Sequence, residues 1–210
     1  MTLFRIVSVL FVILTFGCSP PGGKTSPPPI SIPFPYQCSG PFMGKTLSDD
    51  DVWKVRVAHK RWLKDPQDPH GQQANFCRAE VSSGNFQNAD LRSAVFQMAM
   101  LSGANFIGAQ LNEAQFQGAN LSGSNFSHAQ LTRANMDSAM LHLATFHKTH
   151  FEENISFRDA MLFKTQLQEV DLTKSEGLTQ SQMNMACLDP HTTLPKGLNR
   201  PRPCSERPQS

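Results

Sequence analysis

Hydrophobic and polar positions follow a strict period of five between residues 74 and 153. Each five-residue unit begins with a small residue, usually Ala, and carries Phe, Leu, Val or Met at its third position. The other three positions are mostly polar, and the units follow one another without an insertion. A fixed period of this kind predicts a repeat architecture.

A period of five excludes a regular helix and a flat strand. Helix positions five apart point about 140° away from each other, and strand positions five apart lie on opposite faces. A coil that turns a corner every five residues brings the small and the large residue of each unit inside. Stacked turns would then be joined by parallel, strand-like hydrogen bonds at a spacing of about 4.8 Å.

Turns of 20 residues arrange the large apolar residues in four columns, in which Phe-rich and aliphatic columns alternate. A ten-residue repeat alone would also allow another even number of units per turn. After Phe151 the repeat slips by one residue, which predicts a bulge near 154–156, and it then continues to Leu172. We therefore expect about five coils over residues 74–174. The columns are Phe76, Phe96, Phe116 and Met136; Val81, Leu101, Leu121 and Leu141; Phe86, Phe106, Phe126 and Phe146; and Leu91, Leu111, Leu131 and Phe151.

The units resemble the consensus A-(D/N)-(L/F)-x-x of the pentapeptide-repeat family. The resemblance implies an all-β fold, a right-handed quadrilateral β-helix. Residues 48–63 are similar to the short helix that often precedes such repeats. Residues 177–201 are similar to a C-terminal segment that is common in bacterial members.

The N-terminal flank, residues 46–73, carries the signals of a short capping helix. Ser48 and Asp51 form a capping-box pattern, and Asp65-Pro66 would end the helix. We expect Val55 and Trp62 to cover the first coil.

The C-terminal flank, residues 175–210, repeats this pattern with Thr179 and Gln182. Met183, Ala186 and Cys187 are expected to lie on the last coil. Both flanks would cover the open ends that a solenoid otherwise exposes.

The N-terminus reads as an export signal over residues 1–17, with Arg5 followed by an apolar stretch too short to span a bilayer comfortably. Gly17-Cys18 resembles a bacterial lipoprotein signal, which implies that Cys18 is the lipid-bearing N-terminus of the mature protein. The residues at 15 and 16 depart from that pattern, so an ordinary cleaved signal and an uncleaved anchor stay open. Residues 18–45 are rich in Pro and predict an extended tether.

Cysteine content agrees with export. Apart from Cys18, four cysteines remain, one pair near each cap. In an oxidising compartment the simplest pairing is Cys38–Cys77 and Cys187–Cys204. Three pairings are open at this point, as are free thiols.

No arrangement of residues resembles a catalytic site or implies a cofactor. The local cluster of His128, His142, His147 and His150 would need converging rings to hold a metal, and solvated surface histidines explain it better. Some pentapeptide-repeat proteins mimic DNA through an acidic face. The sparse charge here argues against that role and against nucleic-acid binding.

Several apolar residues occupy outward positions where polar residues are usual. Such surfaces often mark contacts with partners, although scattered apolar residues on a surface are ordinary. Several of them fall on the wall of the column Val81, Leu101, Leu121 and Leu141 or on its edges. The candidate contact residues are Val95, Met98, Met100, Ile107, Met140 and Leu143.

These observations favour a non-enzymatic, lipid-anchored rod in the cell envelope, at the outer membrane and facing the periplasm. It would bind another envelope protein or act as a spacer, and its oligomeric state is open. The alternative is a soluble periplasmic binding module with the same fold. A topoisomerase regulator and a histidine-based metal binder are weaker alternatives.

Overall fold

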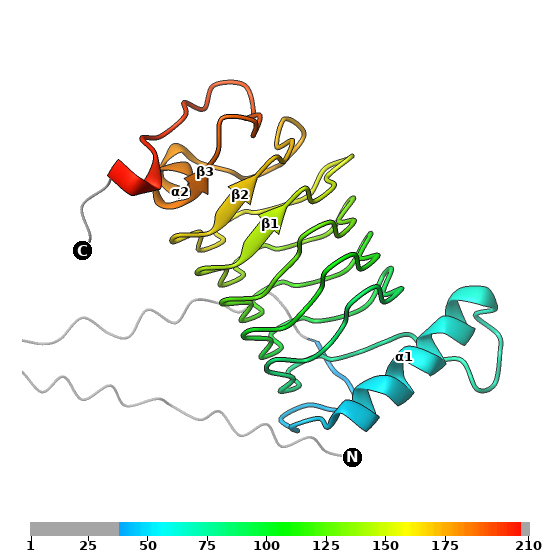
Figure 1. Ribbon diagram of the computed structural model, residues 1–210. Coiled ribbons are helices and arrows are strands. Elements are labelled where there is room, and N and C mark those ends of the chain that lie inside the picture. Colours follow the sequence, from blue (N-terminus) through cyan, green and yellow to red (C-terminus); the bar gives the residue numbers. More distant parts are fainter. Residues whose placement is uncertain (1–37, 207–210) are drawn as a thin grey trace, which may run out of the picture. The chain divides into compact units, whose positions relative to one another are not determined.

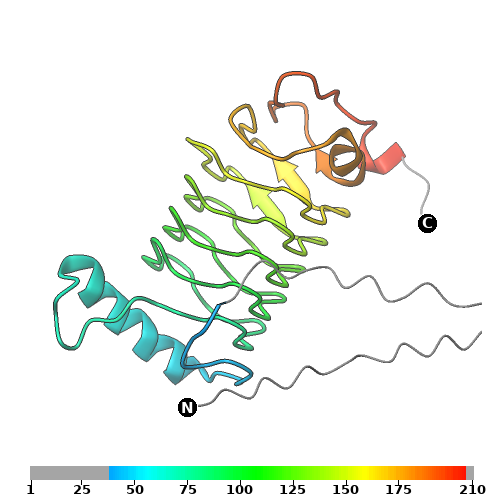
Figure 2. The ribbon, with the colours of Figure 1, turned by 180° about the vertical axis from the view of Figure 1, so that it is seen from behind.

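The computed structural model describes residues 38–206. The expected signal peptide, Cys18 and the tether up to residue 37 lie outside the described residues. Contacts separate residues 1–34 from residues 35–210, so the described residues all belong to the second of these units. They form a stack of coils between two helices (Figures 1 and 2).

The helices and strands are few and short. Helix α1 spans Asp49–Lys64 and helix α2 spans Gln180–Met185. Strands β1 (Thr145–His147), β2 (Gln166–Gln168) and β3 (Cys187–Leu188) form one parallel sheet in that order. A 3-10 helix, η1, spans Cys204–Glu206. No helix among the described residues is both long enough and apolar enough to cross a membrane.

Parallel pairing at a distance of 20 residues builds the coils. Asn85 pairs with Asn105, which pairs with Asn125, and the same step recurs on all four sides. Each pairing position is flanked by backbone hydrogen bonds to the coils before and after it, such as Phe106 N to Asn125 O at 2.8 Å. Four five-residue walls therefore make one turn, as the period predicts.

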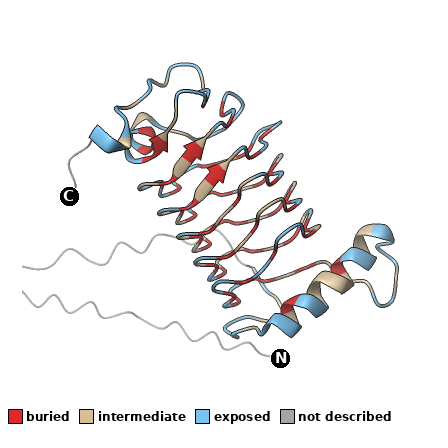
Figure 3. Cartoon of the chain, viewed as in Figure 1, coloured by how far each residue is buried: buried red, intermediate tan, exposed pale blue. Residues whose placement is uncertain are grey.

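The core is the inside of these coils, and Figure 3 shows buried segments along every coil. All four expected columns are buried, and most of their members are fully so. Where a hydroxyl replaces the small Ala, it donates to a core-facing carbonyl: Thr165 Oγ1 to Leu141 O at 2.7 Å, and Ser124 Oγ to Leu121 O at 2.6 Å. These hydroxyls are buried without being left unsatisfied.

The corners explain why a chain can turn every five residues. The last residue of nearly every unit has a positive φ, between 51° and 69° from Arg78 to Lys148. Glycine reaches this left-handed conformation without steric cost. It occupies some of the corners, whereas residues as large as Met98 and Leu143 occupy others.

The predicted slip of one residue is present after Phe151. The pairing distance grows to 21 residues, as in Asn135 with Ser156, and Asn154 has a φ of 20°. Ile155 fills the place of the small residue and is fully buried. The four large residues after the slip are again buried, as expected: Phe157, Leu162, Leu167 and Leu172.

Helix α1 lies against the first coil. The capping box of Ser48 and Asp51 is present, and Asp65 ends the helix. Val55 packs against the core, but Trp62 does not, and its ring instead stacks on His59 at 5.4 Å. A helix of 16 residues is about 24 Å long. It therefore extends past a five-residue wall, and its last turn lies beyond the coil (Figure 1).

The parallel ladder is longer than the range 74–174 expected from the repeat. At the start, Thr46 pairs with Glu80. At the end, β3 pairs with β2, and Thr193 pairs with Asp171. Both flanks add their own backbone to the open edges, which satisfies hydrogen-bonding groups that would otherwise be exposed.

Two disulfides tie the flanks to the coils, and they are the simplest of the three pairings. Cys38 is bonded to Cys77 in the first coil. Cys187 in β3 is bonded to Cys204 in η1.

Candidate functional site

The surface with the most distinctive chemistry lies on one wall of the coils. The second wall is the one whose outward pairing column contains Glu80, Met100, Asn120, Met140 and Met161. Two further columns on this wall and its edge follow from the sequence: Ser82, Ser102, Ser122, His142 and Phe163, then Ser83, Gly103, Gly123, Leu143 and Lys164. Apart from Met100, the outward positions of the first three coils on this wall are small or polar, whereas most of those in the later coils are large and apolar.

Large apolar side chains are concentrated on this wall. Within residues 38–206, seven large hydrophobic residues are exposed, and five of them belong to the second wall or its edge. We call the following six residues the apolar stripe: Met100 (45% exposed), Leu143 (60%), Met161 (51%), Phe163 (39%), Met185 (40%) and the half-buried Met140. Contiguous apolar surface of this kind marks contact sites more often than isolated side chains do.

Backbone hydrogen bonds hold the stripe together although its members are distant in sequence. Leu143 N donates to Phe163 O at 3.1 Å, and Lys164 N donates to Met185 O at 2.9 Å. Met140 pairs directly with Met161. Apart from Met100, which lies two coils before Met140 with Asn120 between them, the stripe therefore crosses three successive layers at the C-terminal end of the coils, and α2 contributes Met185 to it.

Leu143 is the most unusual member. It occupies a corner with a φ of 59°, a conformation that disfavours residues with a Cβ by about 1–2 kcal/mol. Glycine occupies the equivalent corner at Gly103 and Gly123. Because the Leu143 side chain is mostly exposed, burial does not offset this cost. Ser83 and Lys164 occupy the same corner column with φ of 58° and 53°, so Leu143 is distinguished by its large, exposed apolar side chain.

The six contact residues expected from the sequence do not form one surface. Met100, Met140 and Leu143 lie on the second wall or its edge. Val95 belongs to the pairing column of the first wall, Met98 to the corner beside it, and Ile107 follows the third-wall residue Phe106. Three of the six therefore lie on the expected wall of the Val81, Leu101, Leu121 and Leu141 column or its edge, and the other three lie elsewhere.

Sequence reasoning missed Met161, Phe163 and Met185. The first two follow the one-residue slip, so they belong to the second wall only when the count of five is restarted at Phe157. Met185 reaches the stripe because the chain returns to the ladder through α2 and β3. The count that continues after the slip gives the core positions of the fifth coil, and the same count marks Met161 and Phe163 as outward, whereas no local pattern indicates Met185.

The histidines of the expected cluster are distributed over several walls. His142 lies on the second wall beside Phe163, with ring centroids 6.2 Å apart. His128 and His147 meet edge to face at 5.7 Å, and His128 and His150 line a hollow next to the slip. In the described part of the chain, no three His, Cys, Asp or Glu side chains are grouped so as to hold a metal ion.

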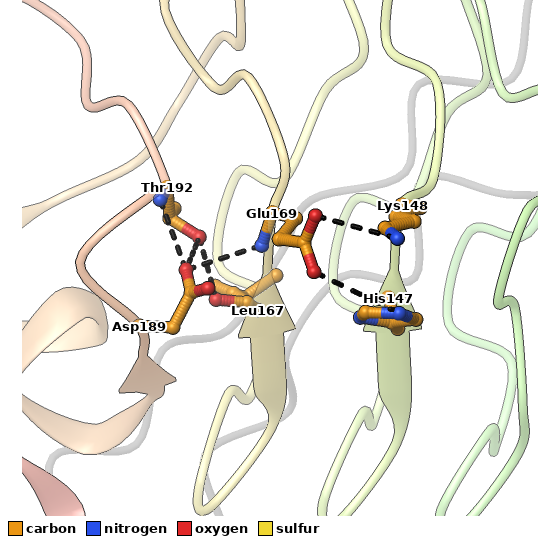
Figure 4. A network of polar contacts seen from close by, with 6 residues as sticks. All are labelled: His147, Lys148, Leu167, Glu169, Asp189 and Thr192. Atoms are coloured by element: carbon orange, nitrogen blue, oxygen red, sulfur yellow. Dashed lines mark hydrogen bonds and ion pairs between the residues drawn. The ribbon is translucent and has the colours of Figure 1, made fainter.

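Near this hollow, a polar network ends the ladder of the third wall (Figure 4). Glu169 contacts Lys148 at 3.5 Å, and its own N–H donates to the Asp189 carboxylate at 3.1 Å. Thr192 donates to Asp189 through its N–H and its hydroxyl. Burial acts to raise the pKa of Asp189, but the hydrogen bonds from Thr192 and Glu169 lower it overall. The Asp189 carboxylate thus accepts the hydrogen bond from Glu169 N–H that a main-chain carbonyl of a further coil would otherwise accept.

These features define a class of protein: a parallel β-solenoid with four five-residue walls and covered ends. A family model for pentapeptide repeats (8 copies) matches residues 72–108 and again residues 109–147. This part of the chain belongs to the pentapeptide-repeat family. A search of curated proteins gave no match.

Several solved structures are similar to the chain. A pentapeptide repeat protein from the Arabidopsis thaliana thylakoid lumen is 21% identical over 53% of this chain and 73% of its own, with a TM-score of 0.43. The pentapeptide repeat protein Rfr23 from the cyanobacterium Cyanothece 51142 is 21% identical over 58% of this chain and 88% of its own, with a TM-score of 0.42. QnrB1, a plasmid-mediated fluoroquinolone resistance protein, is 19% identical over 57% and 79%, with a TM-score of 0.32. At such identities these similarities say nothing about function.

Proposed function

We propose that this protein is a non-enzymatic, exported binding rod that contacts another protein of the cell envelope through the apolar stripe. The observation that carries the proposal is the concentration of exposed Met, Leu and Phe side chains on the second half of one wall. Methionine and aromatic side chains adapt to a partner surface and contribute large contact areas.

Leu143 supports this interpretation. A large side chain that remains exposed at a strained corner is explained if a partner covers it. The two disulfides favour an oxidising compartment, where a periplasmic partner would be found. The lipid on Cys18 would keep the rod at the outer membrane, and five coils between the two caps would set the length of the contact surface.

The contact is tested by site-specific photo-crosslinking in intact cells. A benzophenone amino acid is placed at Leu143, and the control is the same substitution at Asn88, an exposed corner with a φ of 52° next to the third wall. We expect one discrete cross-linked product from position 143 and none from position 88. The product should disappear when Met161 is also changed to Lys. Equal products from both corners would contradict a specific contact surface.

The anchor is tested separately by Cys18→Ser. We expect this variant to leave the membrane fraction and remain exported, because it lacks the acceptor for the lipid. Membrane retention of the variant would support the uncleaved-anchor alternative. Release of the unaltered protein from cells by osmotic shock would favour the soluble periplasmic module.

A further inference from the structure

Helix α1 has an exposed face that its packing on the first coil does not use. Val52 and His59 are buried, and they lie together on the side of α1 that meets the coil. Trp53, Lys60 and Lys64 are exposed, and at about 100° per residue they fall in one row along the helix. Figures 1 and 2 both show α1 at the end of the stack, where further coils do not cover it.

Charge is sorted along α1. The three acidic residues occupy the first turn, where they favour the start of the helix. Residues 52–64 contain no acidic side chain. The basic residues in that stretch are Lys54, Arg56, Lys60, Arg61 and Lys64. The later turns of α1 are therefore positively charged.

Three of these basic side chains are unpaired. Lys54 pairs with Asp50 at 2.5 Å, and Arg56 donates to Asn85 O at 3.2 Å. Within residues 38–206, the side chains of the other three, Lys60, Arg61 and Lys64, make no ion pair or hydrogen bond. The carboxylate of the next acidic residue, Asp65, accepts from the N–H of residue 67 at 3.0 Å. The three cations are thus available to an external anion.

Trp53 adds an apolar group to this face. Two of the seven exposed large hydrophobic residues lie away from the second wall, Met43 and Trp53, and both belong to the N-terminal flank. Trp53 is 60% exposed. An indole ring is apolar with one N–H donor, and it suits a boundary between water and an apolar phase. An exposed tryptophan beside unpaired cations is typical of a helix that lies on an anionic membrane.

A hollow of about 290 Å³ lies between this face and the first coil. Trp53, Arg56 and Lys60 line it from α1, and Asn88 and Asp90 line it from the coil. The guanidinium of Arg92 neutralises the Asp90 carboxylate through two hydrogen bonds of 2.8 Å. The charge of the hollow is therefore set by the two cations of α1, which suits the phosphate of a lipid headgroup.

We propose that the exposed face of α1, formed by Trp53, Lys60, Arg61 and Lys64, docks on a membrane surface that contains anionic phospholipids. Each Lys or Arg near such a surface strengthens binding about fivefold, so the three unpaired cations together contribute about 100-fold. A soluble polyanion would satisfy the cations but offers no apolar layer for Trp53. The membrane is the occupant that uses both features of the face.

This inference goes beyond the proposed function, because it assigns a second surface at the opposite end of the stack from the apolar stripe. Docking through α1 leaves the last coils free to contact a partner. Binding of this kind depends on charge and is screened by salt. Membranes washed in concentrated salt would therefore still lose the Cys18→Ser chain, as the test of the lipid anchor requires.

Vesicle binding tests the proposal on the exported, disulfide-bonded full chain with Cys18→Ser. The chain has two tryptophans, Trp53 and Trp62, so Trp62→Phe leaves Trp53 as the only one. With vesicles of phosphatidylglycerol and phosphatidylcholine in equal parts, we expect its fluorescence to shift to shorter wavelength. Phosphatidylcholine alone should give no shift. In about 1 M salt the screening length falls to about 3 Å, and the shift should disappear.

Matched double variants separate α1 from the net charge of the chain. Lys60→Gln with Lys64→Gln should weaken vesicle binding about 25-fold, which is about fivefold for each cation. Lys174→Gln with Lys196→Gln makes the same change of net charge at the other end of the stack, and it should bind almost as tightly as the parent. Both variants should keep the parent's melting temperature, because all four side chains are exposed.

Four results would overturn the membrane contact: equal binding to neutral vesicles, equal losses from the two double variants, sedimentation with vesicles without a shift of Trp53 fluorescence, or equally tight binding to soluble polyphosphate. The last result would reassign the face to a soluble anion. The proposed function fails differently, because it requires a partner product from position 143 in cells. Loss of that product leaves the vesicle result unchanged, and the reverse also holds.

Discussion

The rings of Phe106 and Phe126 are stacked face to face, with centroids 4.8 Å apart and planes 2° apart. The same geometry recurs from Phe86 to Phe106 and from Phe126 to Phe146. Phe116 of the opposite column meets Phe106 edge-on at 5.8 Å and 88°. The spacing between coils sets the ring spacing, so a period of 20 residues in the sequence becomes a continuous aromatic stack.

Truncation within this stack should be costly. We expect Phe106→Ala to lower the free energy of unfolding by about 3–5 kcal/mol, because it removes a buried ring and leaves a cavity between two others. The control is Asn120→Asp, which should change stability by less than about 0.5 kcal/mol. Asn120 uses its side-chain oxygen to accept from Ser122 N, and a carboxylate oxygen does the same. Equal urea midpoints for the two variants would contradict the inward and outward assignment.

The repeat region could be predicted because the same pattern of small and large residues recurs in every five-residue unit. A large residue at the third position and a small one at the first decide which side chains are inside, and no distant contact alters that result. The flanks, residues 46–73 and 175–210, contain no such repeated pattern. The role of Trp62 was wrong because the length of α1 relative to the wall decides which turn of the helix meets the coil. The pairing of Thr46 and Thr193 with the ladder depends on where the chain returns, which no local pattern encodes.

The candidate site was only partly predictable for a related reason. The repeat marks Met140 and Leu143 as outward on one wall, but Phe163 joins that wall only when the outward positions are counted again after the slip. One inserted residue changes the column of every residue that follows it. Surface function on a solenoid is therefore sensitive to insertions that its core tolerates.

Stability should depend on pH through His59, which connects α1 to the first coil. His59 is fully buried, and its Nδ1 accepts a hydrogen bond from Ala74 N at 3.0 Å, which requires this nitrogen to be unprotonated. Burial lowers the pKa of His59 by penalising the charged form. The main-chain carbonyl of Arg92 and the carboxylate of Asp90 oppose this effect, and the Arg92 guanidinium adds to it.

A lowered pKa in the folded state means that the unfolded chain binds the proton more readily. The contribution of His59 is therefore complete above its ordinary pKa of about 6.5 and decreases as the pH falls below that value. We expect His59→Asn, which keeps an acceptor at the position of Nδ1, to reduce the loss of stability between pH 7.5 and pH 5.5. His70→Asn, at an exposed loop position, is the matched control and should leave the slope unchanged. Urea melts at the two pH values provide the measurement.

The stability of the fold should be sensitive to the replacement of one atom, the side-chain amide nitrogen of Gln182, by oxygen. Its Oε1 accepts from Thr179 N at 2.8 Å, while its Nε2 donates to Phe157 O at 2.8 Å and to Ala160 O at 2.9 Å. Gln182→Glu keeps the cap of α2 but turns a carboxylate oxygen toward two carbonyls at a buried position. We expect a loss of at least about 3 kcal/mol in stability at pH 7.

The loss from Gln182→Glu should diminish at acidic pH, because a protonated carboxyl can again donate to one of the carbonyls. Thr179→Ser is the matched control, since it keeps the hydroxyl of the capping box and should be nearly silent. A pH-independent loss for Gln182→Glu would mean that packing, rather than the two carbonyls, determines the effect.

A substitution at Leu143 can separate the effect on stability of the fold from the effect on contact with a partner. Leu143→Gly places the residue that the corner favours at a φ of 59° and removes an exposed side chain from the apolar stripe. We expect the variant to be more stable by about 1 kcal/mol, which raises the melting temperature by about 2–4 °C. Ser83→Gly, in the same corner column but outside the apolar stripe, should give a similar gain. In intact cells, a benzophenone at Phe163 should capture a partner in the Ser83→Gly background and much less in the Leu143→Gly background. If Leu143→Gly destabilises the protein, or if both variants capture the partner equally, then Leu143 serves the fold and not the contact.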